Sequence, residues 1–401
     1  MAYSILICDD DPALAEEWRE VVDGVISKDL YALKPCERIE EVSNGVSELL
    51  ARRTAARSEG GIEREAQDCV FDNVDILILD YDLLHIDEQR ARYTGEGLAR
   101  LARTFTKCGT IVVVNQFRNA HFDLSLRGNF WSHADLNLNA DLLERPGLWM
   151  DAPWEGFRPW SWQTLYRAVE TQRAREELVE SRLGESIVDV LNMDEDDAIE
   201  LSDSAFGFVA PEAGSFSDFS AQTFECFLKS AVDGRDASAT IDSDPATASR
   251  FVAARIGKWL EREVLGPQDA LIDVPHLIER YPFLMGNDVA ELDAWNATVH
   301  DPERLKAETP DGCWFEPAKF LTRPAVWRHR FEADAEISER RHKYDYSDVP
   351  AFVFLEDTSK FAPLSEAIEF RAGHHNAFDR RFVRHLADFS YAPQRRLAMA
   401  G

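Results

Sequence analysis

The segment from Val74 to Asp80, VDILILD, constrains the fold of this chain more than any other segment. Apart from its aspartates, it consists of valine, isoleucine and leucine, and it ends in an aspartate. A short, continuous apolar run of this kind is typical of a strand that is buried on both faces, as in a parallel sheet covered by helices. We therefore expect such a sheet to organise the first part of the protein.

The first 140 or so residues show strand and helix patterns in alternation. Asp11-Pro12 marks the start of a helix, because proline is favoured in a first helical turn. Asn44-Gly45 is typical of a turn. The alternation predicts an α/β fold with a doubly wound, five-stranded parallel sheet. The expected strands cover 3–8, 38–42, 74–79, 110–114 and 134–138. One helix is expected at 46–57, after the Asn44-Gly45 turn, and another at 96–105, after the third strand.

Polar residues follow the predicted strands at one and the same end. Asp9 and Asp10 end the first strand, Asp80 ends the third, and Asn115 ends the fourth. Ligands of such sheets bind beyond the carboxyl ends of the strands, so we expect these side chains to lie together. Neighbouring carboxylates raise one another's pKa unless a cation lies among them, and Mg²⁺ prefers oxygen ligands. The pattern predicts a magnesium site at which an aspartate could accept a phosphoryl group.

These segments resemble the receiver domain of two-component response regulators. The resemblance covers about the first 140 residues and rests on ILICDDDP at 5–12, DILILDYDL at 75–83 and TGEGLARLAR at 94–103. It implies a flavodoxin-like fold and a histidine kinase or phosphotransfer protein as partner. It also implies that Asp80 is the phosphoacceptor, and that Mg²⁺ is held by the carboxylates of Asp9, Asp10 and Asp80 and by the backbone carbonyl of Asp82.

Two positions depart from the receiver pattern. Asn115 stands where the family usually has threonine or serine. No lysine follows the fifth strand, where the segment ADLNLNAD offers Asn137 or Asn139 instead. Asparagine can donate a hydrogen bond but carries no charge, so the usual sensing of the phosphoryl group is in doubt. Three alternatives stay open: a phosphorylated receiver, a receiver that only binds metal, and a purely structural domain.

The pattern predicts three parts, which are a receiver-like domain at 1–145, a connector at 146–197 and a C-terminal α+β region at 198–401. The connector combines an aromatic segment with a long helix expected at 161–193, which the acidic run 194–197 ends in solvent. The C-terminal region is expected to be mostly helical. It should contain helices at 251–265, from 274, and at 364–370, and a strand at 349–355.

The C-terminal region carries no GxSxG, P-loop or GxGxxG pattern, so the sequence gives no support to the hydrolase, NTPase or dehydrogenase classes. We expect a region that binds a protein partner under the control of the receiver, rather than a dedicated enzyme. A catalytic domain of another kind and a pseudo-receiver scaffold of a stress or defence system are the alternatives. A basic patch could bind an anion or an acidic partner, or pair with the protein's own acidic surface; its arginines are Arg380, Arg381, Arg384, Arg395 and Arg396.

The formal net charge of −29, from 73 acidic and 44 basic residues, repels nucleic-acid phosphates, so we do not expect DNA as a partner. The six scattered cysteines form no CxxC pair and indicate neither disulfides nor a zinc site. The sequence shows no leader peptide and no apolar run near the roughly 20 residues of a membrane span. We expect a cytoplasmic protein, which could form a homodimer through its long helix.

Overall fold

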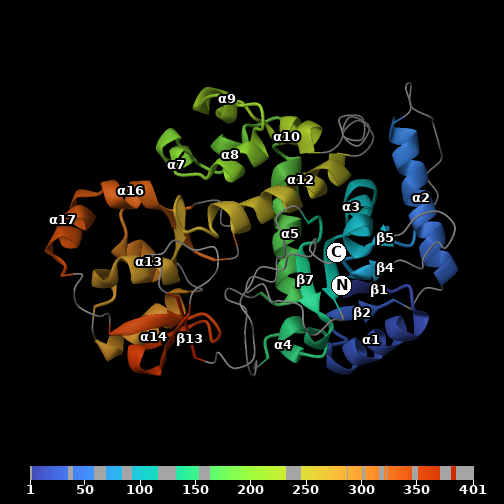
Figure 1. Cartoon of the computed structure of the whole chain (residues 1–401), viewed down its shortest axis with the longest axis horizontal. Coiled ribbons are helices and arrows are strands. Elements are labelled where there is room, and N and C mark those ends of the chain that lie inside the picture. Colours follow the sequence, from blue (N-terminus) through green and yellow to red (C-terminus); the bar gives the residue numbers. More distant parts are fainter. Residues whose placement is uncertain are drawn as a thin grey trace.

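In the N-terminal part of the protein, five parallel strands form one sheet in the order β2-β1-β3-β6-β7 (Figure 1). This finding confirms the predicted α/β class. The strands are β1 (Tyr3–Cys8), β2 (Tyr31–Leu33), β3 (Ile76–Asp80), β6 (Thr110–Asn115) and β7 (Leu136–Asn139). The computed structural model describes residues 2–34, 39–57, 69–83, 93–115, 132–152, 163–231, 245–286, 288–299, 303–315, 320–321, 323–345, 351–370 and 381–384.

Helices cover both faces of this sheet, which explains its continuous apolar strands. Along β3, Ile76 and Ile78 pack in one core with residues of α1 (Pro12–Val25) and α5 (Leu165–Glu180). Leu77 and Leu79 point to the opposite face and pack with residues of α2 (Ile39–Arg57) and α3 (Gly95–Phe105). Alternate residues of one strand therefore belong to two separate cores.

The second strand does not lie where the sequence predicted it. Instead of a strand at 38–42, the structure has β2 at Tyr31–Leu33, and α2 already begins at Ile39. Val42, Val46 and Leu49 are spaced as on one helix face, and that face is buried against the sheet. The prediction was wrong because a five-residue segment with two apolar residues, RIEEV, is too short to show a period, and tertiary packing decided that it belongs to a helix.

Gly45 lies inside α2, so the predicted Asn44-Gly45 turn was also wrong. A Cβ atom at this position would lie 2.7 Å from Cγ1 of Val70 and 2.9 Å from Cε2 of Phe71. Glycine lowers helix stability by about 1 kcal/mol relative to alanine. Here it allows the helix to approach the segment before β3 more closely than any other residue would.

We predict that Gly45→Ala lowers the free energy of unfolding by about 1–3 kcal/mol, because the added methyl group overpacks a buried contact. Gly24→Ala in α1 is the matched control, since a Cβ there meets no atom within 4 Å. Urea titrations of both variants measure the effect. Equal stabilities of Gly45→Ala and the control would show that the close packing has no energetic weight.

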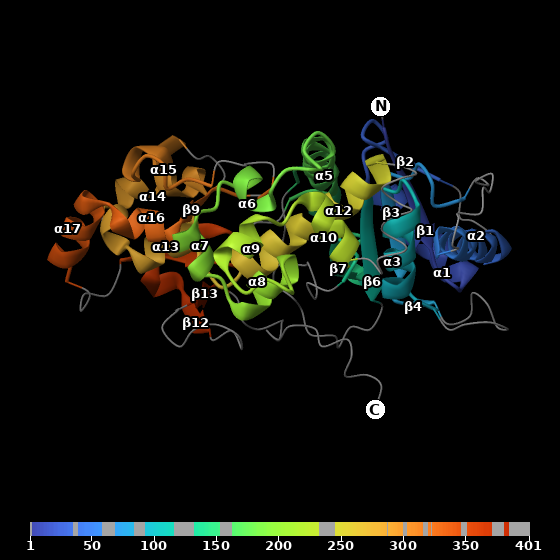
Figure 2. The ribbon, with the colours of Figure 1, turned by 90° about the horizontal axis from the view of Figure 1, so that it is seen from above.

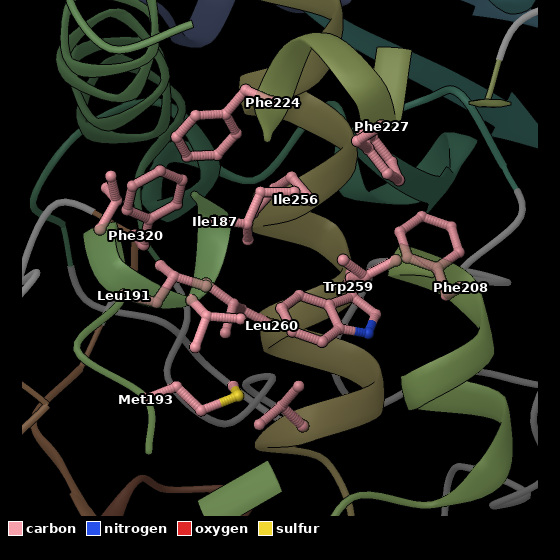
Figure 3. Packing of buried hydrophobic residues seen from close by; sticks show 14 of the residues in the cluster. Ile187, Leu191, Met193, Phe208, Phe224, Phe227, Ile256, Trp259, Leu260 and Phe320 are labelled. Carbon is pink, nitrogen blue, oxygen red and sulfur yellow. The ribbon is translucent and has the colours of Figure 1, made fainter. Parts of the chain in front are cut away.

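The long helix predicted in the connector is shorter than expected. α5 ends at Glu180, four residues of turn follow, and α6 (Ile187–Val190) starts in a new direction. Ile187 donates its backbone N–H to the carbonyl of Gln222 at 2.9 Å. Ile187 and Leu191 thereby enter the core of the C-terminal region, where Phe224, Ile256 and Trp259 also lie (Figure 3). The predicted helix at 161–193 was wrong because burial of these residues requires the chain to turn.

The C-terminal region is mostly helical. Its helix α12 (Pro245–Trp259) and the preceding α5 lie between the rest of this region and the five-stranded sheet (Figure 1). A four-stranded sheet has the order β11-β10-β13-β12, and β8 pairs with β9. The strands are β8 (Leu271–Asp273), β9 (Ala325–Trp327), β10 (Phe352–Leu355), β11 (Lys360–Pro363), β12 (Ile368–Phe370) and β13 (Arg381–Val383).

Several short helices complete the described part of the chain. α12 continues directly into a π-helical turn at Leu260–Val264. Small 3₁₀ turns lie at Ala140–Leu142, Pro282–Leu284 and Leu364–Glu366. The remaining helices are α4 (Pro146–Trp149), α7 (Glu195–Ile199), α8 (Asp203–Val209), α9 (Phe216–Ser220), α10 (Phe224–Ala231), α13 (Val274–Arg280), α14 (Val289–Thr298), α15 (Glu303–Glu308), α16 (Arg328–Ala333) and α17 (Ala335–Lys343).

Two further predictions in this region were wrong. Residues 368–370 form β12 instead of a helix, because they pair antiparallel with β13, a strand that follows later in the chain. The acidic run at 194–197 is not simply solvated. Asp197 is fully buried, pairs with Arg330, and forms a capping box with Asp194 at the start of α7. Within the described residues, no helix combines the length and the apolar character needed to cross a bilayer.

Candidate metal centre

Parallel pairing places the acidic residues predicted by the sequence at one edge of the sheet. β1 pairs with β3 so that Cys8 lies opposite Leu79, and Asp9 and Asp80 therefore follow in adjacent positions. Carboxylate oxygens of Asp9, Asp10 and Asp80 all lie within 4.8 Å of one another. It is the one group of three or more acidic, histidine or cysteine side chains in this arrangement that the described ranges contain.

Asp9 and Asp80 are held in the same way, each by one carboxylate oxygen. The N–H of Asp11 donates to Oδ1 of Asp9, and the N–H of Asp82 donates to Oδ2 of Asp80, both at 2.8 Å. The two side chains are buried, with exposed fractions of 5% and 2%. Their other oxygens, Oδ2 of Asp9 and Oδ1 of Asp80, accept no hydrogen bond from the described residues. Buried oxygens of this kind lower stability unless a proton or a cation compensates them.

The electrostatics of the cluster favour such compensation. Burial, together with the charges of Asp80 and Asp10, raises the pKa of Asp9 to about 7, although the N–H of Asp11 opposes the shift. Burial also raises the pKa of Asp80 to about 6, against the hydrogen bond from the N–H of Asp82. Three clustered carboxylates with two unpaired oxygens fit a hard divalent cation such as Mg²⁺.

α3 begins directly against the end of β3. Gly95 donates its N–H to the carbonyl of Tyr81 at 2.9 Å. A Cβ atom on Gly95 would lie only 2.2 Å from the carbonyl oxygen of Asp80, so no side chain fits there. Thr94 caps the helix by accepting the N–H of Gly97 at 3.1 Å. The TGEG pattern predicted a helix here but not this close contact, for which glycine directly after a capping threonine was the available signal.

The predicted phosphate-sensing asparagines lie on the two strands beyond β3. Asn115 ends β6, one residue beyond the position paired with Asp80, and is itself paired in register with Asn139 of β7. Asn137 is buried, and neither of its side-chain amide atoms has a hydrogen-bond partner among the described residues. These side chains supply amide groups but no charge. Their sensing role, like that of the Asp82 carbonyl as a ligand, stays a prediction.

The predicted basic patch lies mostly outside the described residues, as Arg380, Arg395 and Arg396 do. Arg381 belongs to β13, and only its backbone is described. Arg384 pairs with Glu366 at 3.4 Å, and its N–H donates to the carboxylate of Asp357 at 2.9 Å. For Arg384, pairing with the protein's own acidic surface is therefore the arrangement present.

No family model, curated protein or solved structure matches the chain. The chemistry of the centre is thus defined by its own donor atoms, which are all oxygens and carry negative charge when deprotonated. Such a set binds hard divalent cations through oxygen and disfavours the softer metals that prefer nitrogen or sulfur.

The raised pKa values predict how pH changes the stability of the metal-free protein. Because the folded pKa values of Asp9 and Asp80 exceed the unfolded value near 3.9, both carboxyls stabilise the fold at pH 4. This stabilisation is lost as the pH rises through about 6 to 7. Asp9→Asn should therefore be more stable than the wild type by about 1–3 kcal/mol at pH 8 in EDTA, and close to it at pH 4.

Urea titrations in EDTA at pH 4 and pH 8 measure this difference. Asp29→Asn, an exposed aspartate after α1, serves as the control and should show no such pH-dependent gain. A wild type and an Asp9→Asn variant of equal stability at pH 8 would contradict the cost assigned to the buried carboxylate.

Proposed function

We propose that the protein is a signalling regulator of the response-regulator type, in which Asp9, Asp10 and Asp80 bind Mg²⁺ and Asp80 accepts a phosphoryl group. The observation that carries the proposal is the meeting of these carboxylates at the ends of adjacent parallel strands, where two buried oxygens have no hydrogen-bond partner among the described residues. The strand order β2-β1-β3-β6-β7 agrees with the flavodoxin-like order, which supports a receiver-like domain.

Phosphoryl transfer would use the free oxygen of Asp80 as the nucleophile. Oδ1 forms a bond to the phosphorus of a phosphohistidine on a kinase or phosphotransfer protein, while the phosphorus–nitrogen bond breaks. The imidazole leaves and takes a proton from solvent, and Asp80 becomes an acyl phosphate. The N–H of Asp82 holds Oδ2 and so fixes the orientation of the attacking carboxylate. Mg²⁺ held by Asp9, Asp10 and Asp80 would supply positive charge that offsets the incoming phosphoryl oxygens.

The proposed phosphoryl site differs from that of a usual receiver domain in its two asparagines. Asn115 and Asn139 offer hydrogen bonds without charge, so they would not replace the metal as a cation that pairs with the phosphoryl group. The output is control of the C-terminal region, which acts on a protein partner in the cytoplasm. A second candidate function retains the metal but not phosphoryl transfer, and the lack of a hydroxyl side chain at Asn115 favours it.

Incubation of the full chain with MgCl₂ and acetyl phosphate, followed by intact-mass spectrometry, tests the proposal. We expect the wild type to gain the mass of one phosphoryl group, because acetyl phosphate replaces the phosphohistidine as donor and acetate leaves. Asp80→Asn should gain none, whereas Asp29→Asn should behave as the wild type. MgCl₂ should also raise the melting temperature of the wild type but not that of Asp80→Asn.

The two readouts separate the candidates. Magnesium-dependent stabilisation without a mass gain would replace phosphoryl transfer by metal-dependent docking. A mass gain that persists in Asp80→Asn would assign the acceptor to another residue, and the absence of both effects would overturn the proposed function.

A further inference from the structure

α12, a helix of the C-terminal region, packs against α5 and α3 of the N-terminal part (Figure 2). Two cations of α12 are buried in this contact, Arg255 with an exposed fraction of 5% and Lys258 with 4%. Nη1 of Arg255 and Nζ of Lys258 both donate to the carbonyl of Ser132, at 3.0 and 3.2 Å. Lys258 also donates to the carbonyl of Ala134. α12 thus holds the segment that leads into β7.

Glu96, in the first turn of α3, is a shared counter-charge for these cations. Burial lowers the pKa of Lys258 to about 7 and that of Arg255 to about 10, and the charge of Glu96 opposes both shifts. Glu96 is also bonded to the same segment, because Oγ of Ser132 donates to its carboxylate at 2.5 Å. The charge and the hydrogen bond of one side chain therefore both support the docking of α12 on α3.

Glu96 is in turn attached closely to the metal centre. It directly follows Gly95, whose Cα lies against the carbonyl of Asp80 with no room for a methyl group. The N–H of Gly95 is bonded to the next carbonyl of the chain, that of Tyr81. A displacement of the end of β3 must therefore move the first turn of α3, because close-packed backbone cannot absorb it.

We propose that cation binding at Asp9, Asp10 and Asp80 is coupled to the docking of α12 through Glu96 and Ser132. The coupling rests on the proposed function, since it requires the metal centre. A cation held by the carboxylates of Asp9, Asp10 and Asp80 would fix the end of β3 and, with it, the position of Glu96. Tighter docking of α12 must then strengthen cation binding by the same factor, because coupling between two sites is reciprocal.

Hydrogen–deuterium exchange of the full chain, with and without MgCl₂, tests this coupling. Magnesium affinity is measured on the same samples by isothermal titration calorimetry. We expect MgCl₂ to slow exchange in peptides of α12 by at least about fivefold, the lower end of usual couplings. Ser132→Ala keeps all charges and removes the hydroxyl that bonds Glu96. This variant should bind Mg²⁺ but lose the slowing.

Two further variants complete the design. Ser249→Ala removes a hydroxyl from α12 itself, where it donates to the carbonyl of Pro245, and should retain the response. Glu96→Gln keeps an acceptor oxygen without the charge and should weaken the response. Mg²⁺ binding with unchanged exchange in the wild type, or full slowing in Ser132→Ala, would overturn the coupling alone. No Mg²⁺ binding at all would overturn the metal-based function together with it.

Discussion

The parallel pairing of β1 with β3 is the constraint on which the site depends. β1 is apolar from Ile5 to Cys8 and β3 from Ile76 to Leu79, and an aspartate follows each run, so pairing in register brings like charges together at a buried edge. Burial and the neighbouring charges accordingly raise the pKa of Asp9 and of Asp80. The backbone amides of Asp11 and Asp82 hold one oxygen of each carboxylate, and the other oxygen accepts no hydrogen bond from the part of the chain that the structure describes. The fold therefore stores at this edge an electrostatic strain that binding of a divalent cation would relieve.

The two halves of the chain are joined by buried charges as well as by apolar packing. Arg175 of α5 lies 3.7 Å from Glu261, which belongs to the π-helical turn after α12. Arg323 pairs with both Glu261 and Asp273, at 3.2 and 2.9 Å. Gly257 leaves room for the guanidinium of Arg175, since a Cβ there would lie 2.6 Å from Nη1. Buried ion pairs contribute little net stability, but breaking one is costly, so this network specifies how α5 and α12 pack.

Much of the N-terminal fold could be predicted from local pattern. The strands ending at Cys8, Asp80 and Asn115 are continuous apolar runs with polar ends, and the predicted carboxylate cluster follows from their order alone. The errors have a common cause. β2 is only three residues long. Gly45 lies within a helix that packs closely against Val70 and Phe71. β12 exists through pairing with β13, and α5 ends where residues must enter another core. In each case the deciding partner lies far away in the sequence.

The sequence by itself determined the α/β class and the residue types that meet at the carboxyl ends of the strands. Both follow from periodicity and from the polar residue that ends each run, which are local properties. Only the tertiary structure decided which carboxylate oxygens are anchored and which are unpaired, and that Arg255 and Lys258 are buried beside Glu96. These features depend on burial and on distances between segments remote in the chain, and no local pattern encodes them. Close packing of the folded chain fixes which groups surround each buried charge.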